Sequence, residues 1–333
     1  LVNVGVKWFE VNNEPNVVDE WDEGAWGASS LEQKAKIVAI NWMSDAENVI
    51  KRGGLPAFPA LAPCGHTKEF GSVLWWEAMF KALQRYQPDV TSLFKRGAWL
   101  AVHVSPVNHC YKDEKGQWHF EYPYDPICQA DKPGLTIYWD DNGLLGYRVP
   151  QKMLKDLFGV EPVIMSTEGG VFAPRGGFEQ KDSRYPGIDF QGHAERTVAM
   201  FDWAAVHAPD LTTVCCWLVG NDKFGHPDPR WNEDAWYRKE WTLPVVAAMK
   251  ATAAVDQAAL TEKVRNAAWN QKGIAYNPDA TFQKWARANS LGAPVTGEFD
   301  VPAGGRTYRA QGFDGAILWC EVGDWGNVQV LVW

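Results

Sequence analysis

The sequence predicts a mixed α/β fold for about the first 254 residues, followed by a small α+β module. In the first part, short apolar runs alternate with amphipathic helical stretches, which is typical of βα units around a parallel sheet. From about residue 257 the pattern changes to helical stretches and then short apolar runs between glycine-rich turns. We therefore expect one domain at 1–254 and a second at 257–333.

Five apolar runs are expected to form the strands of the sheet. They are short and bounded by turn-forming or polar residues, and they lie at 6–12, 55–62, 99–104, 163–167 and 213–219. Helices are expected at 31–52, 73–86, 150–158, 192–207 and 243–254. Ser29 or Ser30 would cap the first of these helices, and Gly53-Gly54 would end it.

Composition restricts the class of function. The net charge of −9 argues against a nucleic-acid-binding surface, which needs a basic face. The sequence has no uninterrupted apolar stretch of about 20 residues, so we expect no membrane-spanning helix. Nineteen tryptophans suit a carbohydrate-binding protein, because aromatic faces stack on sugar rings, although we expect core packing to use most of them.

Two of the apolar runs lead to glutamates. The first leads to Asn13-Glu14-Pro15, and the second ends at Glu168. Because the carboxyl ends of parallel strands meet at one face, we expect both carboxylates to face one cleft. Two such carboxyl groups are the smallest set of catalytic groups that can cleave a glycosidic bond by acid/base chemistry. Glu10 shares the strand of Glu14 and is a second candidate acid, for which we favour a structural role.

These segments resemble strands four to eight of a clan A retaining glycoside hydrolase, which is a (β/α)8 barrel of the TIM type. In that clan the fourth strand ends in Asn-Glu, often Asn-Glu-Pro, and this glutamate is the general acid/base; Glu14 matches it. The seventh strand ends in the nucleophilic glutamate, often followed by glycine, as in Glu168-Gly169. The strand count between the two motifs agrees with the resemblance.

The resemblance also implies substrate-binding residues. Asn13 would bind the sugar 2-hydroxyl, His103 on the sixth strand would lie near the site, and Trp217 on the eighth strand would form the floor of a sugar subsite. The alternatives are a hydrogen-bonded core histidine and a tryptophan that only packs in the core. In the implied mechanism Glu14 holds a proton while Glu168 is ionised.

The sequence departs from the clan in two ways. Ser105 and Pro106 stand where a tyrosine usually follows the sixth-strand histidine. The tyrosines that could replace it are Tyr111, Tyr122, Tyr124 and Tyr138. Strands one to three are also missing, and five strands alone would leave sheet edges open. We expect an upstream segment of the same gene product, or a further chain, to supply them.

A long irregular segment from 105 to about 143 follows the third run, and loops of this length are usually functional. Its aromatic residues, Tyr138 and Trp139 among them, are expected to line a glycan cleft or to pack within the loop. Cys110 and Cys128 bracket part of the loop. A disulfide between them would suit a secreted protein, and two unpaired thiols are the alternative.

The last 75 or so residues resemble modules with a Leu-Gly-x-Pro signature that are appended to cell-wall-associated proteins and hydrolases. Leu291-Gly292-Ala293-Pro294 carries the signature. Helices are expected at 258–269 and 280–289, and a strand at 328–333. The resemblance implies attachment to a wall or surface, and hence a secreted or cell-surface location.

The sequence therefore predicts a retaining glycosidase that acts on a β-linked poly- or oligosaccharide and needs no metal or organic cofactor. The alternative is a non-catalytic carbohydrate-binding or surface-structural protein on a degenerate barrel. Geometry distinguishes the two hypotheses. Carboxylates about 5 Å apart in an open cleft favour an enzyme, whereas a blocked cleft, or glutamates paired with arginine, favours a scaffold.

Overall fold

The computed structural model describes residues 5–22, 24–65, 70–87, 89–174, 181–221, 229–238, 240–253, 273–274 and 277–332. The chain divides into two compact units, Leu1–Lys250 and Ala251–Trp333. The helix predicted at 258–269 lies outside the described residues.

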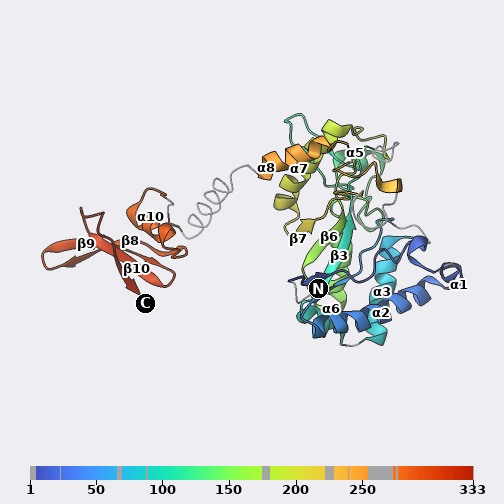
Figure 1. Ribbon diagram of the computed structural model, residues 1–333, viewed down its shortest axis with the longest axis horizontal. Helices are drawn as coiled ribbons and strands as arrows, with labels where there is room; N and C mark the ends of the chain where they lie inside the picture. The colour runs from blue at the N-terminus through green and yellow to red at the C-terminus, as the bar shows by residue number, and fades with distance from the viewer. Residues whose placement is uncertain are drawn as a thin grey trace. The chain divides into compact units, whose positions relative to one another are not determined.

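The first unit is built on a five-stranded parallel sheet (Figure 1). Its strands are β1 (Trp8–Phe9), β2 (Leu55–Phe58), β3 (Trp99–Val104), β6 (Ile164–Gly169) and β7 (Leu211–Val214). Their order in the sheet is β1-β2-β3-β6-β7, which is the order along the chain. The five predicted strands are present in the predicted order, but β7 ends at Val214, so Trp217 follows this strand instead of lying on it.

The sheet is curled but does not close into a barrel in the described part of the chain. In a flat sheet β1 and β6, three steps apart, would be separated by about 14 Å. Yet Thr167 Oγ1 on β6 donates a 2.9 Å hydrogen bond to Glu10 Oε1, just past β1. The strands therefore form an open half-barrel, with β1 and β7 at its edges. Of the expected eight-stranded barrel, the described residues form only these five parallel strands.

Helices connect the strands close to where the sequence predicts them. They are α2 (Leu31–Lys51), α3 (Ser72–Tyr86), α6 (Arg148–Phe158), α7 (Phe190–His207) and α8 (Pro244–Ala253). Ser30 caps α2 by a reciprocal pair of hydrogen bonds with Gln33. Shorter elements that the sequence analysis did not predict are η2 (Val18–Glu20), α1 (Ala25–Ala28), α4 (Val90–Lys95), β4 (Tyr111–Lys112), β5 (Trp118–His119), α5 (Pro126–Asp131) and η4 (Pro229–Trp231).

The main core lies between the convex face of the sheet and its helices. α2 packs against β2 and α3, and α3 packs against α6; these helices lie together in Figure 1. Trp42 of α2 and Phe58 of β2 are fully buried, with ring centroids 4.8 Å apart. Trp42 Nε1 also donates a hydrogen bond to the carbonyl of Ala57, so the indole is satisfied as well as buried.

The predicted disulfide is wrong, because Cys110 and Cys128 are both free thiols. They are buried in different places: Cys110 packs in the main core, whereas Cys128 belongs to a small cluster with Tyr122 and Tyr185. The long loop that carries them is thus held by packing and by side-chain hydrogen bonds, such as that from the Tyr185 hydroxyl to Asp125.

The second unit is a four-stranded antiparallel sheet with one described helix, α10 (Thr281–Ala288). Its strands are β8 (Pro294–Ala303), β9 (Arg306–Phe313), β10 (Ala316–Glu321) and β11 (Gln329–Val332), in the order β11-β10-β9-β8. Phe282 of α10 packs with Phe313 and Leu318 of the sheet. In the described residues of the whole chain, no helix has the length and apolar character needed to cross a bilayer.

Candidate active site

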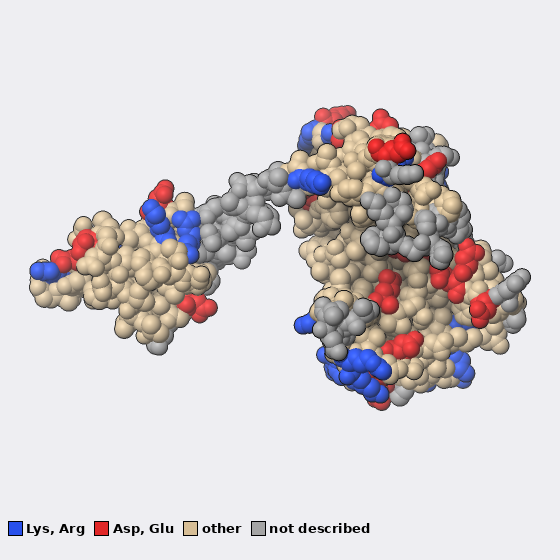
Figure 2. Space-filling view, viewed as in Figure 1, with Lys and Arg blue, Asp and Glu red and all other residues tan. Residues whose placement is uncertain are grey.

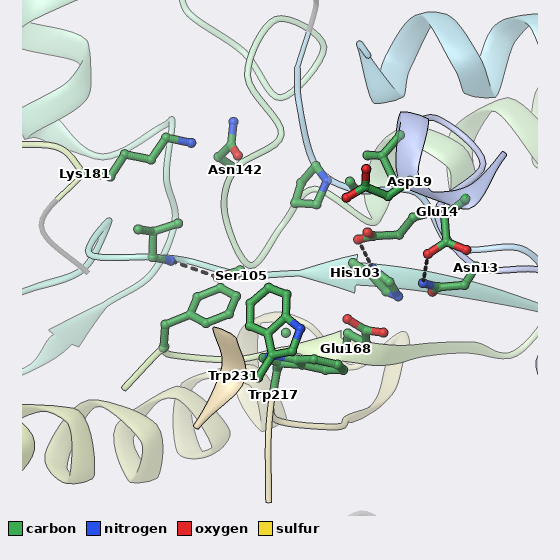
Figure 3. Close-up of a pocket in the computed structure, with 17 residues that line it drawn as sticks. Asn13, Glu14, Asp19, His103, Ser105, Asn142, Glu168, Lys181, Trp217 and Trp231 are labelled. Carbon is green, nitrogen blue, oxygen red and sulfur yellow. Dashed lines mark hydrogen bonds and ion pairs between the residues drawn. The ribbon is translucent and has the colours of Figure 1, made fainter. Parts of the chain in front are cut away.

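The carboxyl ends of the parallel strands surround a cleft of about 460 Å³ (Figure 3). Segments that follow β1, β2, β3, β6 and β7 all contribute to its wall. The lining residues are Asn13, Glu14, Val17, Asp19, Glu20, Ala62, Pro63, His103, Ser105, Val107, Asn142, Glu168, Gly169, Phe172, Lys181, Trp217 and Trp231. Five of the residues singled out from the sequence as catalytic or sugar-binding are among them: Asn13, Glu14, His103, Glu168 and Trp217.

Glu14, His103 and Glu168 meet at one end of the cleft. One ligating atom from each of the three side chains lies within 4.8 Å of the other two, so a carboxylate oxygen of Glu14 is within 4.8 Å of one of Glu168. His103 Nδ1 lies 2.7 Å from Glu14 Oε1, and the imidazole is almost fully buried. The two glutamates, 154 positions apart in the sequence, are therefore neighbours across an open cleft (Figure 3).

The backbone around Glu14 is held in an unusual conformation. Asn12 has a φ of 66° and Glu14 a φ of 37°, values that residues other than glycine rarely adopt. The Glu14 amide donates a 3.1 Å hydrogen bond to the carbonyl of Ala60, and Asn13 pairs with the same residue as an isolated parallel bridge. The chain beyond β1 is thus fastened to the segment beyond β2, and this aims the Glu14 carboxylate into the cleft.

Gly169 is required next to Glu168 for a steric reason. Its φ is +145°, and a Cβ at this position would lie 2.1 Å from the carbonyl oxygen of Val104. No side chain fits at that distance, so β6 approaches β3 closely only because residue 169 is glycine. The Glu-Gly motif is thereby explained by the packing of the two strands.

The environment raises the pKa of Glu168 to about 7. Burial is the main cause, His103 opposes it, and the nearby carboxylates of Glu14, Glu10 and Glu20 raise it further. The ionised Glu168 that the sequence analysis expected therefore predominates only above about pH 7 in the unliganded protein.

His103 experiences opposing influences. Burial lowers its pKa, but the hydrogen bond to Glu14 and the charges of Glu14, Glu168 and Glu10 outweigh burial, so the pKa is raised. Its Nε2 atom is buried and has no hydrogen-bond partner among the described residues. His103 therefore contacts Glu14 and lies close to Glu168, rather than serving only as a core residue.

Trp217 and Trp231 stand beside Glu168 in the cleft (Figure 3). Their ring centroids are 5.4 Å apart with planes at 84°. Trp217 Nε1 is buried without a hydrogen-bond partner among the described residues, and the peptide bond that follows Trp217 is cis. The two indoles give the cleft an apolar wall next to its carboxylates.

Several lining residues were not predicted from the sequence. Asp19, Glu20, Asn142, Lys181 and Trp231 all come from loops or short 3-10 turns, where no periodic pattern marks a functional position. Glu20 Oε1 accepts a 3.3 Å hydrogen bond from Asn13 Nδ2, which places both beside the acid. In Figure 2, acidic side chains lie in the middle and at the top of the first unit as viewed, and lysines and arginines lie mainly at its top and along its lower edge.

Two predicted substrate-binding residues do not line the cleft. Tyr138 packs against the main core, and Trp139 is 61% exposed away from the site. The tyrosines proposed to touch the nucleophile are also elsewhere: Tyr122 donates to Asp140, and Tyr111 stacks on His119. Ser105 itself lines the cleft, and its hydroxyl donates to the carbonyl of Gly170. Of the aromatic residues predicted to bind sugar, Tyr138 and Trp139 therefore do not line this cleft.

A cation could be held by only one group in the described part of the chain, and it is the same Glu14, His103 and Glu168 cluster. The short contact between His103 Nδ1 and Glu14 is an acid–base hydrogen bond rather than a gap between two metal ligands.

Comparisons with known proteins give no family assignment. No protein-family model matches the chain, and no curated protein matches it. Among solved structures, one match is the crystal structure of an endo-β-1,3-glucanase of glycoside hydrolase family 128, subgroup II, from Sorangium cellulosum. It has a TM-score of 0.40 and 14% identity, and the match covers 73% of this chain and 69% of that one. A likeness of this size carries no argument about activity, which has to come from the geometry of the site.

Proposed function

We propose that this protein is a retaining glycoside hydrolase that cleaves a β-linked poly- or oligosaccharide with Glu14 and Glu168. The observation that carries the proposal is the closeness of the two carboxylates, whose oxygens approach within 4.8 Å at an accessible cleft. Retaining enzymes hold their carboxyl groups about 5–5.5 Å apart, whereas inverting enzymes leave about 6.5–9.5 Å for a water molecule. The geometry supports the retaining mechanism.

In the first step Glu168 attacks the anomeric carbon, and a covalent glycosyl-enzyme forms as the glycosidic bond breaks. Glu14 gives its proton to the leaving oxygen. In the second step Glu14 takes a proton from water, and the hydroxide oxygen displaces Glu168 from the anomeric carbon. The enzyme then regains its starting protonation, with the pair's single proton on Glu14.

His103 favours the ionised Glu168 that this cycle needs, whereas burial and the nearby carboxylates oppose it. The pair must carry one proton and one negative charge before attack. A positively charged His103, 2.7 Å from Glu14, opposes the effect of burial on Glu168. Esterification of Glu168 removes one negative charge from the cluster and so favours loss of the proton from Glu14, as the second step requires.

The remaining cleft residues are assigned to sugar binding. Trp217 and Trp231 offer indole faces next to Glu168, and Asn13 presents an amide beside Glu14. We retain the proposal that Asn13 binds the 2-hydroxyl.

We further propose that additional βα units complete the half-barrel. β1 and β7 each have one neighbouring strand in the described sheet, and Trp8, on edge strand β1, is 47% exposed. Parallel strands are normally buried on both faces, so we expect further structure to cover the exposed side of β1. Such units would come from a segment upstream on the same polypeptide or from a further chain, and co-purification with the chain from its native source would identify them.

A secreted or cell-surface location remains our proposal for the whole chain. Its support is the resemblance of the second unit, around Leu291-Gly292-Ala293-Pro294, to modules of wall-associated proteins. Fractionation of the native cells into cytosol, surface and medium tests it, and recovery in the cytosol alone would remove it.

Mechanism-based trapping tests the enzymatic proposal. The chain is incubated with a panel of 2-deoxy-2-fluoro β-glycosides that carry good leaving groups, and labelled peptides are mapped by mass spectrometry. We expect one label, on Glu168, and none in a Glu168→Gln variant. A label on Glu14 instead would reverse the two roles, and no label from any member of the panel would count against a retaining glycosidase.

The second candidate is a non-catalytic carbohydrate-binding protein. One observation favours it: Glu14 is already engaged by His103 in the unliganded cleft. The two candidates differ in turnover but not in binding. If oligosaccharides bind the chain while a sensitive reducing-sugar assay detects no hydrolysis, and Glu168→Gln leaves binding unchanged, the binding protein is the better account.

A further inference from the structure

The strand that carries Glu168 contains a β-bulge just before the glutamate. In the β3–β6 pairing Val102 lies opposite Ser166, and His103 lies opposite Glu168, so Thr167 is the extra residue. Side chains of a regular strand alternate between faces, which would give Glu168 the same face as Ser166. The bulge resets the alternation, and Glu168 consequently lines the cleft while Ser166 is fully buried.

Ser166 supports this bulge from within. Its hydroxyl donates a 2.6 Å hydrogen bond to the carbonyl of Glu168 and accepts a 3.3 Å bond from the amide of Val104. These contacts satisfy backbone groups that the irregular pairing leaves without a ladder partner. The two Ser166 hydrogen bonds hold the backbone of β6 only on its buried side, so a separate contact has to hold β6 on the side that faces the cleft.

The contact on the cleft side is the hydrogen bond between Thr167 and Glu10. Thr167 Oγ1 donates to Glu10 Oε1 at 2.9 Å. β2 and β3 stand between β1 and β6 in the sheet, so this bond spans the concave side directly. It joins the residue immediately before Glu168 to a residue four positions before Glu14, and so links the two segments that carry the pair.

The segment after β1 needs such an anchor. β1 contains only two residues, and the next part of the chain has positive φ angles at Asn12 and Glu14. Conformations of this kind persist only where the surrounding structure fixes them from both sides. The hydrogen bond from the Glu14 amide to the Ala60 carbonyl holds the C-terminal end of this segment, and the Glu10 side chain holds its N-terminal end.

We propose that Glu10 and Thr167 are positioning residues whose side-chain hydrogen bond sets the separation and orientation of Glu14 and Glu168. The inference rests on the roles proposed above for the two glutamates. It assigns Thr167 the task of holding the bulge that aims Glu168, and it assigns Glu10 a second task, as a charge near the reacting groups. Neither residue lines the cleft, so neither is a catalytic residue.

The second task follows from the groups that surround Glu168. They are His103 on β3, Glu14 and Glu10 after β1, and Glu20 in η2. Burial is the largest influence on Glu10 and raises its pKa, although its side chain has solvent access on the open side of the half-barrel. Its charge raises the pKa of both Glu168 and His103. Loss of the charge and loss of the hydrogen bond should therefore give different signals.

Four variants separate the two tasks. Thr167→Val removes the hydroxyl and keeps the shape, and Thr167→Ser restores the hydroxyl. Glu10→Gln removes the charge and keeps an acceptor oxygen. The matched control is Thr213→Val, an exposed threonine on the neighbouring strand β7.

We expect Thr167→Val to lower kcat about 10- to 100-fold with little change in KM, because small displacements of reacting groups cost rate rather than binding. Thr167→Ser should recover to within about threefold of the wild type, and Thr213→Val should equal it. Glu10→Gln should move the acidic limb of the kcat/KM profile down by about half a pH unit. A Thr167→Val enzyme with unchanged kcat, or equal losses in the Ser and Val variants, would overturn the positioning role.

A readout without turnover separates this inference from the proposed function. The ring-proton NMR titration of His103 should shift down by about half a unit in Glu10→Gln, even if no glycoside is a substrate. Crystal structures of wild type and Thr167→Val should show a wider separation of the Glu14 and Glu168 carboxyl carbons in the variant. If the wild type is inactive but the His103 titration shifts and the carboxyl separation widens as expected, only the proposed glycosidase activity is contradicted. If the His103 titration does not shift and the carboxyl separation does not change, the positioning role of Glu10 and Thr167 is contradicted.

Discussion

The convex face of the five-stranded sheet and the carboxyl-terminal ends of the same strands differ in how their buried polar atoms are hydrogen-bonded. On the convex face, Trp42 and Phe58 are fully buried, and the Trp42 indole nitrogen is hydrogen-bonded. At the strand ends, His103 Nε2 and Trp217 Nε1 are buried without partners in the described residues, and the pKa of Glu168 is raised to about 7. The first region satisfies its polar atoms as it buries them, whereas the second keeps buried polar atoms without partners and a carboxyl group with a raised pKa.

From this comparison we expect that substitutions can alter stability and activity separately. Substitutions on the convex face should change stability and leave the pH dependence of activity alone. Substitutions at the strand ends should change activity and leave stability unchanged or higher, because an unfavourable local environment is the cost of function there. The predictions below test this separation, from the largest expected effect to the smallest.

Glu168→Gln should lower kcat/KM by about 10⁴-fold or more, because the nucleophile is lost. The free energy of unfolding should rise at pH 8 by about 1–2 kcal/mol, a value reduced for the partial exposure of the side chain. The folded-state pKa is raised from 4.5 to about 7, so the ionised form is disfavoured in the fold, and stability falls as pH rises through that window.

Urea unfolding at pH 4 and pH 8 checks the second part of that prediction. The gain should vanish at pH 4, where Glu168 is protonated in both the folded and the unfolded state. Glu161→Gln, at an exposed ion pair with Lys155, is the matched control. A variant less stable than the wild type at pH 8 would show that Glu168 is a structural carboxylate.

Trp42→Ala should destabilise the protein by about 3–5 kcal/mol, because it removes a fully buried indole from the main core. At a temperature where the variant is folded, the shape of its pH–activity profile should match that of the wild type. Thermal unfolding and kinetics on the same preparation measure both effects. Trp139→Ala, at a 61% exposed position, is the control and should cost far less.

The pH dependence of kcat/KM should have an acidic limb near pH 7. Glu168 must be ionised to attack, and burial raises its pKa to about that value in the free protein. Steady-state rates from pH 4 to 9 at constant ionic strength give the profile. An acidic limb close to pH 4.5 would mean that Glu168 is solvated like an ordinary carboxylate, and the contrast between the two regions would weaken.

Reducing agents should leave the melting temperature unchanged to within about 1 °C, since every cysteine is a free thiol and a disulfide typically contributes 2–4 kcal/mol. Thermal unfolding with and without dithiothreitol measures it. A fall of several degrees would restore the Cys110–Cys128 disulfide that the sequence suggested.

The elements of the first unit could be predicted because they follow simple periodicities. The strands at Trp99–Val104 and Ile164–Gly169 are short apolar runs, and the helix at Leu31–Lys51 has a capping box and a glycine stop. Glu14 and Glu168 could be placed together because parallel strands end on one side. Strand order along the chain then put them on one cleft.

The rest of the site depends on irregular backbone. Strict alternation of β6 would have turned Glu168 away from the cleft, and the bulge at Thr167 that corrects it has no marker in a single sequence. Trp231, Asp19 and Lys181 come from segments without periodicity. Tyr138 and Trp139 do not line the cleft, because Tyr138 packs on the core and Trp139 is exposed, and only the path of the loop decides where such side chains lie.

The stereochemistry of hydrolysis tests the central claim most directly. The chain is mixed with a β-linked oligosaccharide that it cleaves, and the anomeric protons of the first-formed product are followed by NMR before mutarotation. A pair of carboxylates with oxygens within 4.8 Å predicts that the β-anomer appears first. Appearance of the α-anomer first would show that water attacks directly, and Glu168 could not then be the nucleophile.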